Sequence, residues 1–331
     1  MDNNKVYITS MGVVIGNKTN SSQKEFLIEA AQYEPMLACF QTRNIDRISK
    51  ILLSAATTAL IRRGVAEPNF KIQKGENNDY GVILGTQFSA LDSIHQYDME
   101  GLEKGALAVN PGLFPNTVLN SPACQVSIQC SFAGPVYTVC NGLTSSLDAI
   151  GMGYNFVRTG LSSMLLAGGA DEAAELQIMM KRSDQNLGEA GGFLMLESEK
   201  TITGNEKLAE IIGYQSKVLS KEQKGSLFET ISNLIIDVTV SEENNMTDVT
   251  NISVGSVFHS CESEDILSGI CKNIYFSGNR ECVKINWMGA CGIVQASKAL
   301  GDIGTRKGKS VMWVLINIDQ EKVAVLALKS I

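Results

Sequence analysis

Cysteine and histidine are the side chains that most often carry covalent or metal chemistry, and this sequence holds eight cysteines and two histidines. The histidines, His95 and His259, do not begin a cluster with zinc-ligand spacing, so no metal site is expected. No two cysteines have the C-x-x-C spacing, and their scatter favours buried free thiols over a disulfide framework. The cysteines stand at positions 39, 124, 130, 140, 261, 271, 282 and 291. With so few histidines, few residues are available for acid–base chemistry near neutral pH.

Composition and charge narrow the class of protein. Of the 331 residues, 44% are hydrophobic and 19% are charged, which is ordinary for a folded chain with a buried core. The net charge is −7 and no basic stripe is present, so a nucleic-acid partner is not expected. The sequence has no run of about 18 apolar residues and no secretion signal at its start. We therefore expect a cytoplasmic protein without a membrane partner.

Strand and helix patterns alternate along the chain. A helical pattern begins near Asp46 and stops at Gly64, and the region 136–169 is typical of a strand, a helix and a second strand. We expect one hairpin from 191–198 with 208–216, and another from 311–319 with 322–329. Further strands are predicted at 6–14, 80–86 and 251–258, a further helix at 288–300, and a surface helix with a loop within 217–250.

The order of these elements predicts mixed α/β layers, with helices packed on sheet faces. Two stretches with a similar order each end in a hairpin pattern, which indicates an internal duplication. We divide the chain into an N-terminal half, 1–205, and a shortened C-terminal half, 206–331, which together form one compact unit.

Several motifs in a fixed order carry a family resemblance. The longest is GPVYTVCNGLTSSLDAIGMGYNFVRTGLSSMLLAGGADE at 134–172, where the turn AGGADE is interpreted as structural. The others are VYITSMGVV (6–14), FPNTVLNSPACQVSI (114–128) and GEAGGFLMLES (188–198). Together they resemble the β-ketoacyl synthases of the thiolase fold, strongly from residue 5 to about 215. The resemblance implies a duplicated five-layer αβαβα architecture with mixed sheets.

A condensing ketosynthase uses a cysteine at a helix N-terminus, where the helix dipole favours the thiolate. Aligned without gaps from Gly134, that position of the family falls on Leu143, which cannot attack an acyl group. Cys140 lies three residues earlier, on the incoming strand, and is interpreted as a small buried side chain rather than a displaced nucleophile.

The other catalytic positions of the family are also altered. His259 follows the strand at 251–258 and is a remnant of the first catalytic histidine or an ordinary loop histidine. Asn286 stands where the second histidine is expected, and Glu281 where the family has a lysine. The glycine-rich signature of the G-F-G-G-T-N type has no counterpart before VAVLALKSI (323–331). We therefore expect no catalytic residue.

Ketosynthase-like proteins without the nucleophile include the chain-length factors of type II polyketide synthases. This resemblance implies a heterodimer with an active ketosynthase and only indirect contact with an acyl carrier protein. It implies no cofactor, since phosphopantetheine enters with the partner's substrate. The subunit would shape a tunnel that limits the length of a polyketide or polyene chain. The residues implied at this tunnel or interface are Leu113, Phe114, Thr117 and Val118.

Two alternatives stay open. The first is a divergent acyltransferase or condensing enzyme that uses Cys140 together with His259. The second is a homodimeric binding protein without enzymatic activity. The product, an aromatic polyketide or an aryl polyene, is also left open by the sequence.

Overall fold

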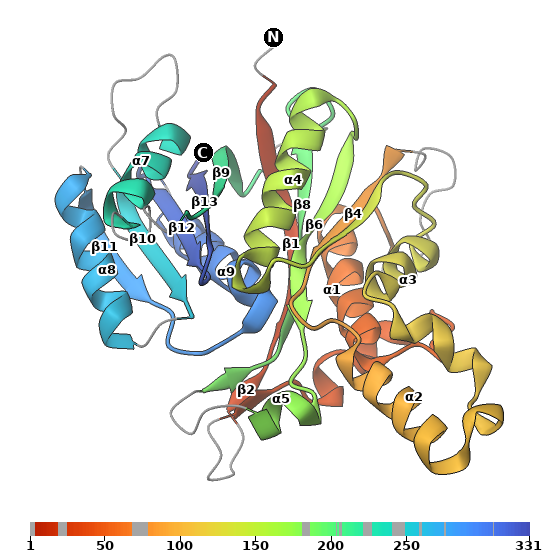
Figure 1. The fold of residues 1–331 in the computed structure, drawn as a ribbon. Coiled ribbons are helices and arrows are strands. Elements are labelled where there is room, and N and C mark those ends of the chain that lie inside the picture. Colours follow the sequence, from red (N-terminus) through yellow and green to blue (C-terminus); the bar gives the residue numbers. More distant parts are fainter. Residues whose placement is uncertain are drawn as a thin grey trace.

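The computed structural model describes residues 4–18, 25–67, 79–180, 186–202, 204, 207–220, 227–239, 249–257, 260–274, 276–306 and 308–331. Within these residues the centre is a ten-stranded mixed sheet, in the order β11-β10-β12-β13-β9-β1-β8-β6-β4-β5 (Figure 1). Its first half consists of β1 (Val6–Ile15), β4 (Gly81–Gly85), β5 (Val136–Val139), β6 (Met164–Asp171) and β8 (Ala190–Ser198). Its second half consists of β9 (Ala209–Val218), β10 (Val249–Ser256), β11 (Phe276–Cys282), β12 (Met312–Ile318) and β13 (Lys322–Lys329). The halves meet where Val6 to Ile8 of β1 pair with β9.

The two halves of the sheet have the same topology. Numbered along the chain within each half, the strands stand side by side in the order 3-2-4-5-1 in both. In that order, the first three strands of each half are parallel to one another. The last two pairs of neighbouring strands are antiparallel in both halves. The expected thiolase-like, duplicated α/β fold is therefore confirmed.

Helices cover both faces of each half (Figure 1). Three hydrophobic clusters mark the contacts between the layers. The middle cluster joins α4 (Ser145–Thr159) and α9 (Cys291–Thr305), which lie between the two half-sheets. The outer cluster of the first half includes α1 (Arg47–Arg63) and α3 (Ser121–Gln129), and that of the second half α7 (Leu227–Thr239) and α8 (Ser260–Asn273). The smaller elements are β2 (Asn17–Lys18), β3 (Glu25–Leu27), β7 (Leu187–Gly188), α5 (Glu175–Met180), and the 3-10 turns η1 (Ala30–Gln32), η2 (Glu34–Leu37), η6 (Gly142–Thr144) and η7 (Met288–Ala290).

Residues at both ends of the first long helix, α1, determine where it begins and ends. Asp46 caps α1, because its side chain accepts a hydrogen bond from Ser49 N at 3.0 Å. The helix ends at Gly64, which takes the left-handed conformation with φ 78°. Eleven of its residues are buried, so α1 is a core helix held against the first half-sheet. The predicted helix is confirmed.

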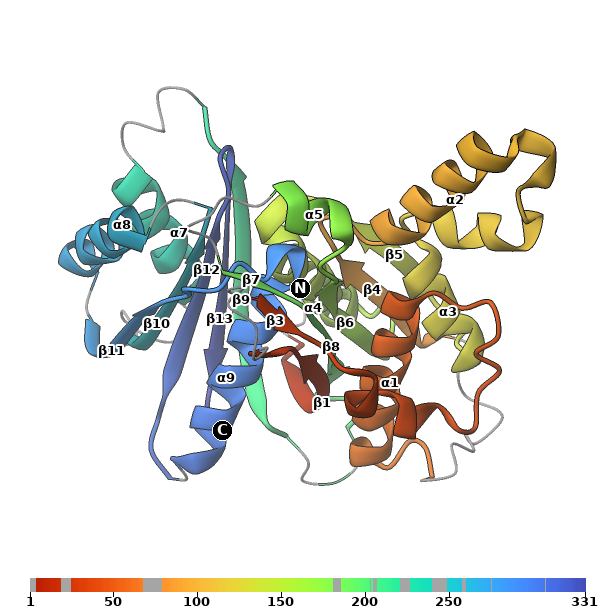
Figure 2. The ribbon, with the colours of Figure 1, turned by 90° about the horizontal axis from the view of Figure 1, so that it is seen from below.

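One segment of the first half extends away from the layers. Residues 91–118, here called the arm, contain α2 (Leu91–Lys104), η4 (Ala106–Ala108) and η5 (Pro111–Thr117). The arm projects from the molecule beyond β4 and α3 (Figure 2). Asn116 is its one buried residue, and all residues of the arm are described by the structure. It joins the second strand of the first half to α3, whereas α8 follows the second strand of the other half.

One expectation about the elements is wrong, and another is confirmed over the described residues. Strands β8 and β9 do not form a hairpin, since each pairs with β1, which lies between them. β1 is apolar on both faces and buried over most of its length, so it needs a neighbour on each side. The predicted surface helix is confirmed over α7, which buries Ile231, Leu234, Ile235 and Val238 in the outer cluster and exposes Glu229, Asn233 and Asp237 on its other face. Residues 221–226 and 240–248 of that predicted segment lie outside the described residues.

The hairpin of β12 and β13 is confirmed. Strand β11 was not expected, and its mostly exposed, polar residues explain why no strand pattern pointed to it. Within the described residues, no helix is both long and apolar enough to cross a bilayer.

Candidate functional site

The turn between β5 and α4 holds the position at which a catalytic nucleophile was sought. We call residues 140–145 the first elbow. Gly142 has a φ of 63°, and a Cβ there would lie 2.1 Å from Asp319 Oδ2, so the turn favours glycine. Leu143 follows, and its side chain is only 3% exposed within the middle hydrophobic cluster. An apolar, packed side chain therefore occupies this position.

A carboxylate of this same chain accepts a hydrogen bond from the backbone of the first elbow. Leu143 N donates to Asp319 Oδ2 at 2.7 Å, just ahead of the first turn of α4. The amino end of a helix attracts anions, because its free N–H groups and its dipole point at them. Asp319 stands in the turn of the β12–β13 hairpin, where its Oδ1 also accepts from Gln320 N at 2.6 Å. The helix end that would assist an acyl anion or a thiolate is thus already satisfied internally.

The second half contains a matching turn, here called the second elbow (286–291), between β11 and α9. Met288 has a φ of 52° there, at the place that Gly142 takes in the first elbow, and α4 and α9 are both 15 residues long. Gly289 N donates to Asp171 Oδ2 at 2.7 Å, just as Leu143 N donates to Asp319. Asp171 ends the fourth strand of its half, and Asp319 directly follows the fourth strand of the other. Each half therefore supplies a carboxylate to the elbow of the opposite half.

Asp171 is the more buried of the two carboxylates. Besides Gly289 N, it accepts hydrogen bonds from Thr86 Oγ1 and from the backbone N–H groups of Gln87, Phe88 and Ser89, at 2.8 to 3.1 Å. It is 1% exposed. Burial raises the pKa of Asp171 to about 6, against the lowering effect of these donors. Asp171 ties the loop after β4 to the second elbow, which supports the structural interpretation of AGGADE.

A second polar network joins the first turns of α4 to strands β9 and β13 of the second half-sheet. Lys322 of β13 forms an ion pair with Asp148 Oδ2 at 2.6 Å, and Tyr214 of β9 donates to Asp148 Oδ1 at 2.5 Å. Asn141 and Thr144 also donate to Asp148 Oδ2. Burial, followed by the nearby Asp148 charge, raises the pKa of Tyr214, so Tyr214 stays a donor. These contacts hold α4 to the second half-sheet.

The two residues of the alternative catalytic hypothesis are placed differently. Cys140 is exposed and directly follows β5, so its interpretation as a small buried side chain on that strand is wrong; its Sγ donates to Gln87 O at 3.3 Å. Its surroundings raise the pKa of the Cys140 thiol by partial burial, and nearby Asp171 raises it further. This is the opposite of the shift that activates a nucleophilic cysteine. His259 lies outside the described residues.

The remaining altered positions make structural contacts. Asn286 Oδ1 accepts from Met288 N at 3.0 Å, and its backbone pairs with Asn186 and Gly188, so this side chain supports the second elbow. Glu281 on β11 accepts from Ser253 and forms an ion pair with Lys298. Within the described residues, no group of three or more histidine, cysteine, aspartate or glutamate side chains lies close enough to hold a metal ion.

The four residues implied at a tunnel or interface lie together on the arm. Leu113 and Thr117 are half-buried, whereas Phe114 and Val118 are 57% and 42% exposed. Thr117 Oγ1 donates to Phe114 O at 2.8 Å, and the Phe114 ring lies 6.1 Å from that of Tyr97 on α2. The first three of these residues lie in η5, and Val118 directly follows it.

Sequence reasoning did not identify Asp319, Asp148 or Lys322. A signal for Asp319 was present, because it directly follows the fourth strand of its half, just as Asp171 ends the fourth strand of the other. Aligning the two halves with each other would have paired them.

The family model described as "Beta-ketoacyl synthase, N-terminal domain" matches residues 2–199. The chain belongs to the β-ketoacyl synthase family. Its resemblance to this family, stated from the motifs, is confirmed.

The curated relatives are themselves synthases and related proteins. The chain is 21% identical over 266 residues to 3-oxoacyl-[acyl-carrier-protein] synthase 2 of Vibrio cholerae, covering 65% of this chain and 63% of that protein. It is 26% identical over 194 residues to nodulation protein E of Rhizobium meliloti, covering 52% and 47%. The chain thus spans less than two thirds of the length of these relatives.

Solved structures match over the whole chain. One is described as a type II PKS acyl-carrier protein in complex with its ketosynthase bound to the hexaketide, with a TM-score of 0.80, 15% identity and coverage of 99% and 100%. Another is the ishigamide ketosynthase/chain length factor, with a TM-score of 0.76, 16% identity and 99% coverage of both chains. At this identity, these matches establish the ketosynthase fold.

Proposed function

We propose that this protein is a non-catalytic ketosynthase-like subunit that pairs with an active ketosynthase and limits the length of the chain that the pair builds. The observation that carries the proposal is the first elbow, where Leu143 replaces a nucleophile and Asp319 takes its backbone N–H. Catalysis of acyl transfer needs a nucleophile and free donors for the developing oxyanion. Both requirements are unmet at this position.

A free sheet edge supports the pairing. Within the described residues, β5 pairs with β4 on one side and has no strand on the other. Its Tyr137 is 49% exposed, and Ile128 on the neighbouring α3 is 67% exposed. An open edge beside exposed apolar side chains favours association with another chain. The ketosynthase/chain length factor among the structural matches makes a ketosynthase the first partner to test.

The proposal extends to the partner's substrate. An acyl carrier protein would dock on the active ketosynthase rather than on this chain, because a net charge of −7 repels an acidic carrier protein. Phosphopantetheine would then reach the interface only as the group that carries the partner's substrate, and this chain would need no cofactor. We also propose a cytoplasmic location. Leu113, Phe114, Thr117 and Val118 are the proposed lining of the tunnel end.

Co-purification with the ketosynthase encoded nearest to this chain tests the proposal. We expect a stable one-to-one complex, and products longer by one or more units when Phe114→Ala widens the tunnel end. The control is Leu161→Ala, since Leu161 is 65% exposed just beyond the far end of α4. A chain that stays alone, or a complex whose product length ignores Phe114→Ala, would contradict the proposal.

A further inference from the structure

A cluster of charged side chains surrounds the first residues of α1. Arg47 contacts two glutamates, since its Nη1 lies 3.0 Å from Glu172 Oε2 and its Nη2 lies 2.7 Å from Glu189 Oε2. The side chains of Glu172 and Glu189 are only 6% and 4% exposed, whereas Arg47 is partly open to solvent. Asp46, which precedes Arg47, is buried too. Three buried carboxylates therefore share one guanidinium, and we call these four residues the α1 cluster.

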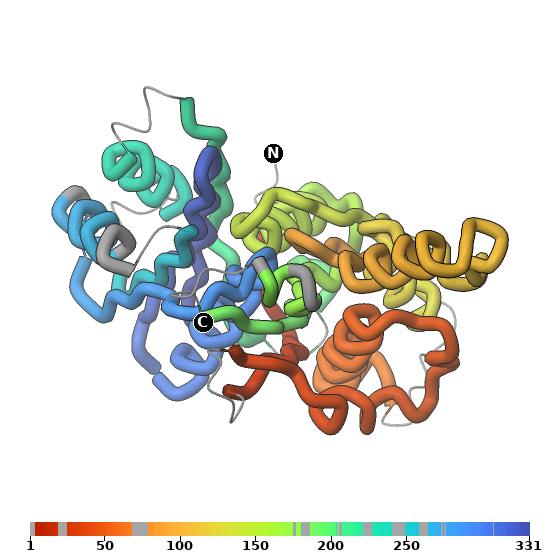
Figure 3. The backbone as a smooth tube through the Cα atoms, turned by 60° about the horizontal axis from the view of Figure 1, so that its bottom comes forward, coloured from red at the N-terminus to blue at the C-terminus, as the bar shows by residue number. Residues whose placement is uncertain are grey.

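The α1 cluster joins separate parts of the first half. Glu172 directly follows β6, and Glu189 stands between β7 and β8. Figure 3 shows the red segment that leads into α1 beside the green segment that contains α5, and β3 pairs in parallel with β7. Glu172 is also next in sequence to Asp171, whose carboxylate binds the second elbow. A change in the charge of the cluster therefore acts on the end of β6.

Hydrogen-bond donors are shared unequally among the three carboxylates. Glu189 accepts from both Nη atoms of Arg47 and from two backbone N–H groups, at 2.6 to 3.0 Å. Glu172 Oε2 accepts from Arg47 Nη1. Asp46 Oδ1 accepts from Ser49 N, but Asp46 Oδ2 is buried and has no hydrogen-bond partner among the described residues. A buried acceptor without a donor is costly, and a neighbouring carboxyl group that kept its proton would supply the missing donor.

The charges of the cluster favour one retained proton. With all three carboxylates ionised, the cluster would carry a net charge of −2 in a buried place. Burial raises the pKa of Glu172 to about 8, against the lowering effect of Arg47, and the charges of Asp46 and Glu189 raise it further. Burial also raises the pKa of Asp46. Two other titratable side chains act on this cluster from α1 and from the residue before η2, namely Lys50 near Asp46 and Tyr33 near Arg47.

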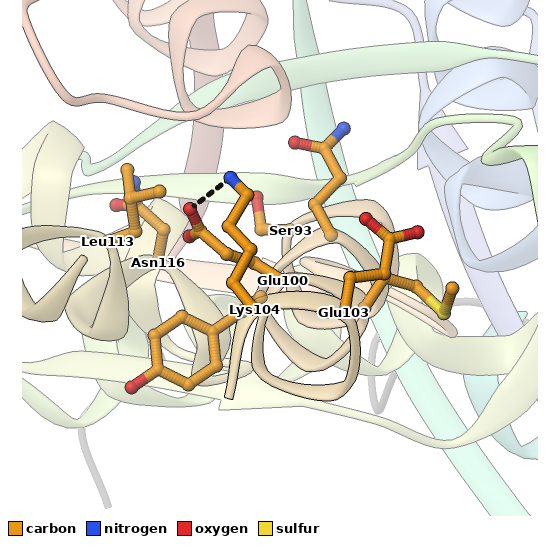
Figure 4. A pocket seen from close by; sticks show the side chains of 9 residues that line it. Ser93, Glu100, Glu103, Lys104, Leu113 and Asn116 are labelled. Carbon is orange, nitrogen blue, oxygen red and sulfur yellow. Dashed lines mark hydrogen bonds and ion pairs between the residues drawn. The ribbon is translucent and has the colours of Figure 1, made fainter. Parts of the chain in front are cut away.

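An acidic group on the surface of the arm shows the opposite balance (Figure 4). Glu100, Glu103 and Lys104 line a pocket of about 390 Å³, and Lys104 Nζ lies 2.9 Å from Glu100 Oε1. The hydrogen bond from Lys104 lowers the pKa of Glu100. On this open surface one base is enough to favour the carboxylate, whereas burial at Glu172 outweighs the guanidinium beside it.

We infer that Glu172 keeps a proton at neutral pH and acts as a proton-dependent lock, donating a hydrogen bond to Asp46 Oδ2 while it accepts one from Arg47. The protonated lock fastens the start of α1 to the end of β6. When Glu172 ionises, Asp46 Oδ2 loses its donor and a second uncompensated charge remains in the cluster. The contact between α1 and β6 then loosens. This response is a property of the chain alone and does not depend on pairing with a ketosynthase.

The lock makes the stability of the protein depend on pH. Glu172 holds its proton more tightly in the folded protein than in the unfolded chain, where a glutamate has a pKa of 4.5. The stability that the lock contributes is therefore present below about pH 4 and is lost as the pH rises through about 8. Between about pH 6 and 8, mostly above the range of Asp171, the equilibrium constant for unfolding should rise by up to about tenfold for each pH unit.

Urea unfolding of two variants between pH 6 and 8 tests the lock. Glu172→Gln keeps an acceptor for Arg47 and a donor for Asp46 but cannot ionise. Its unfolding constant should stay nearly the same over this range and be about tenfold or more below that of the wild type at pH 8. Glu197→Gln is the matched control, because Glu197 is buried against a single guanidinium, that of Arg63, at 2.7 Å. The control should be less stable than the wild type at every pH and keep the wild-type slope.

Each outcome decides for or against the lock. If Glu172→Gln destabilises the protein at pH 7 as much as Glu197→Gln does, Glu172 is an ordinary ionised partner of Arg47 and the inference is overturned. The inference is also overturned if the slope between pH 6 and 8 persists in Glu172→Gln, because another group then carries it. Should Glu172→Gln fail to fold, a carbon NMR titration of the glutamate carboxyl groups in the wild type decides instead. A glutamate that titrates near pH 8 supports the lock, whereas titration of every glutamate below pH 6 refutes it.

Discussion

The two halves of this protein share a fold and differ in what they present at corresponding places. Both have the strand order 3-2-4-5-1, an elbow with a positive φ, and a 15-residue helix after the elbow. Both elbows receive a carboxylate from the opposite half, at the same N···O distance of 2.7 Å. The pairs Leu143–Asp319 and Gly289–Asp171 are therefore two copies of one contact that joins the halves.

The differences lie in burial and in insertions. Asp171 is buried among five donors, whereas Asp319 is half-buried in a short hairpin turn. The first half alone carries the arm between its second and third strands. A duplicated fold can thus keep the contacts that join its halves while the connections between corresponding strands differ.

The largest expected effect is a difference in stability between variants of the two carboxylates, Asp171 and Asp319. Asp171→Ala leaves five donors without their acceptor in a buried site, and we expect it to lower the free energy of unfolding by about 4 kcal/mol. Asp319→Ala removes a half-buried acceptor with two donors, and about 1 kcal/mol is expected. Urea unfolding of both variants measures the difference. Equal losses would show that the two contacts are equivalent in energy and would contradict this account.

Of these two carboxylates, Asp171 should contribute more to the pH dependence of stability. Burial raises the pKa of Asp171 from 3.8 to about 6, so the folded protein holds its proton where the unfolded chain has released it. The stability contributed by protonated Asp171 is therefore present below about pH 4 and is lost as the pH rises to about 6, by up to about 3 kcal/mol. Asp171→Asn should flatten this part of the stability curve. An unchanged slope in urea unfolding between pH 4 and 6 would refute the assignment.

A cysteine placed in the first elbow should report the charge of Asp319. In Leu143→Cys the new thiol lies near that carboxylate, which opposes thiolate formation. Adding Asp319→Asn keeps the size of the side chain and removes its charge, so the thiol pKa should fall by about one unit or more. Alkylation rates against pH give both values. The same titration curve in the single and double variants would mean that the charge of Asp319 does not affect the pKa of a thiol in the first elbow.

The smallest effect is expected at Cys140. Cys140→Ala removes an exposed thiol with a single long contact, so the free energy of unfolding should change by less than about 0.5 kcal/mol. Product yield of the complex should stay the same. A large loss of yield with an unchanged fold would return Cys140 to a catalytic role.

Much of the fold could be predicted from local patterns, and the parts that could not depend on distant contacts. Asp46 and Gly64 predicted the limits of α1, because caps act within one turn. β8 and β9 looked like a hairpin because sequence neighbours usually pair, whereas the place of β1 between them is set by the sheet as a whole. For the site, the motif located Leu143 but not Asp319, 176 residues further along. Contacts between duplicated halves leave little trace in a local motif.

The proposed lack of a nucleophile in this chain is tested most directly by finding which chain of the complex becomes acylated. The purified complex would be loaded with an acyl thioester of the carrier protein, and the intact mass of each chain measured. We expect an acyl adduct on the ketosynthase alone, with the mass of this chain unchanged in the wild type and in Cys140→Ala. An adduct on this chain that disappears in Cys140→Ala would contradict the account.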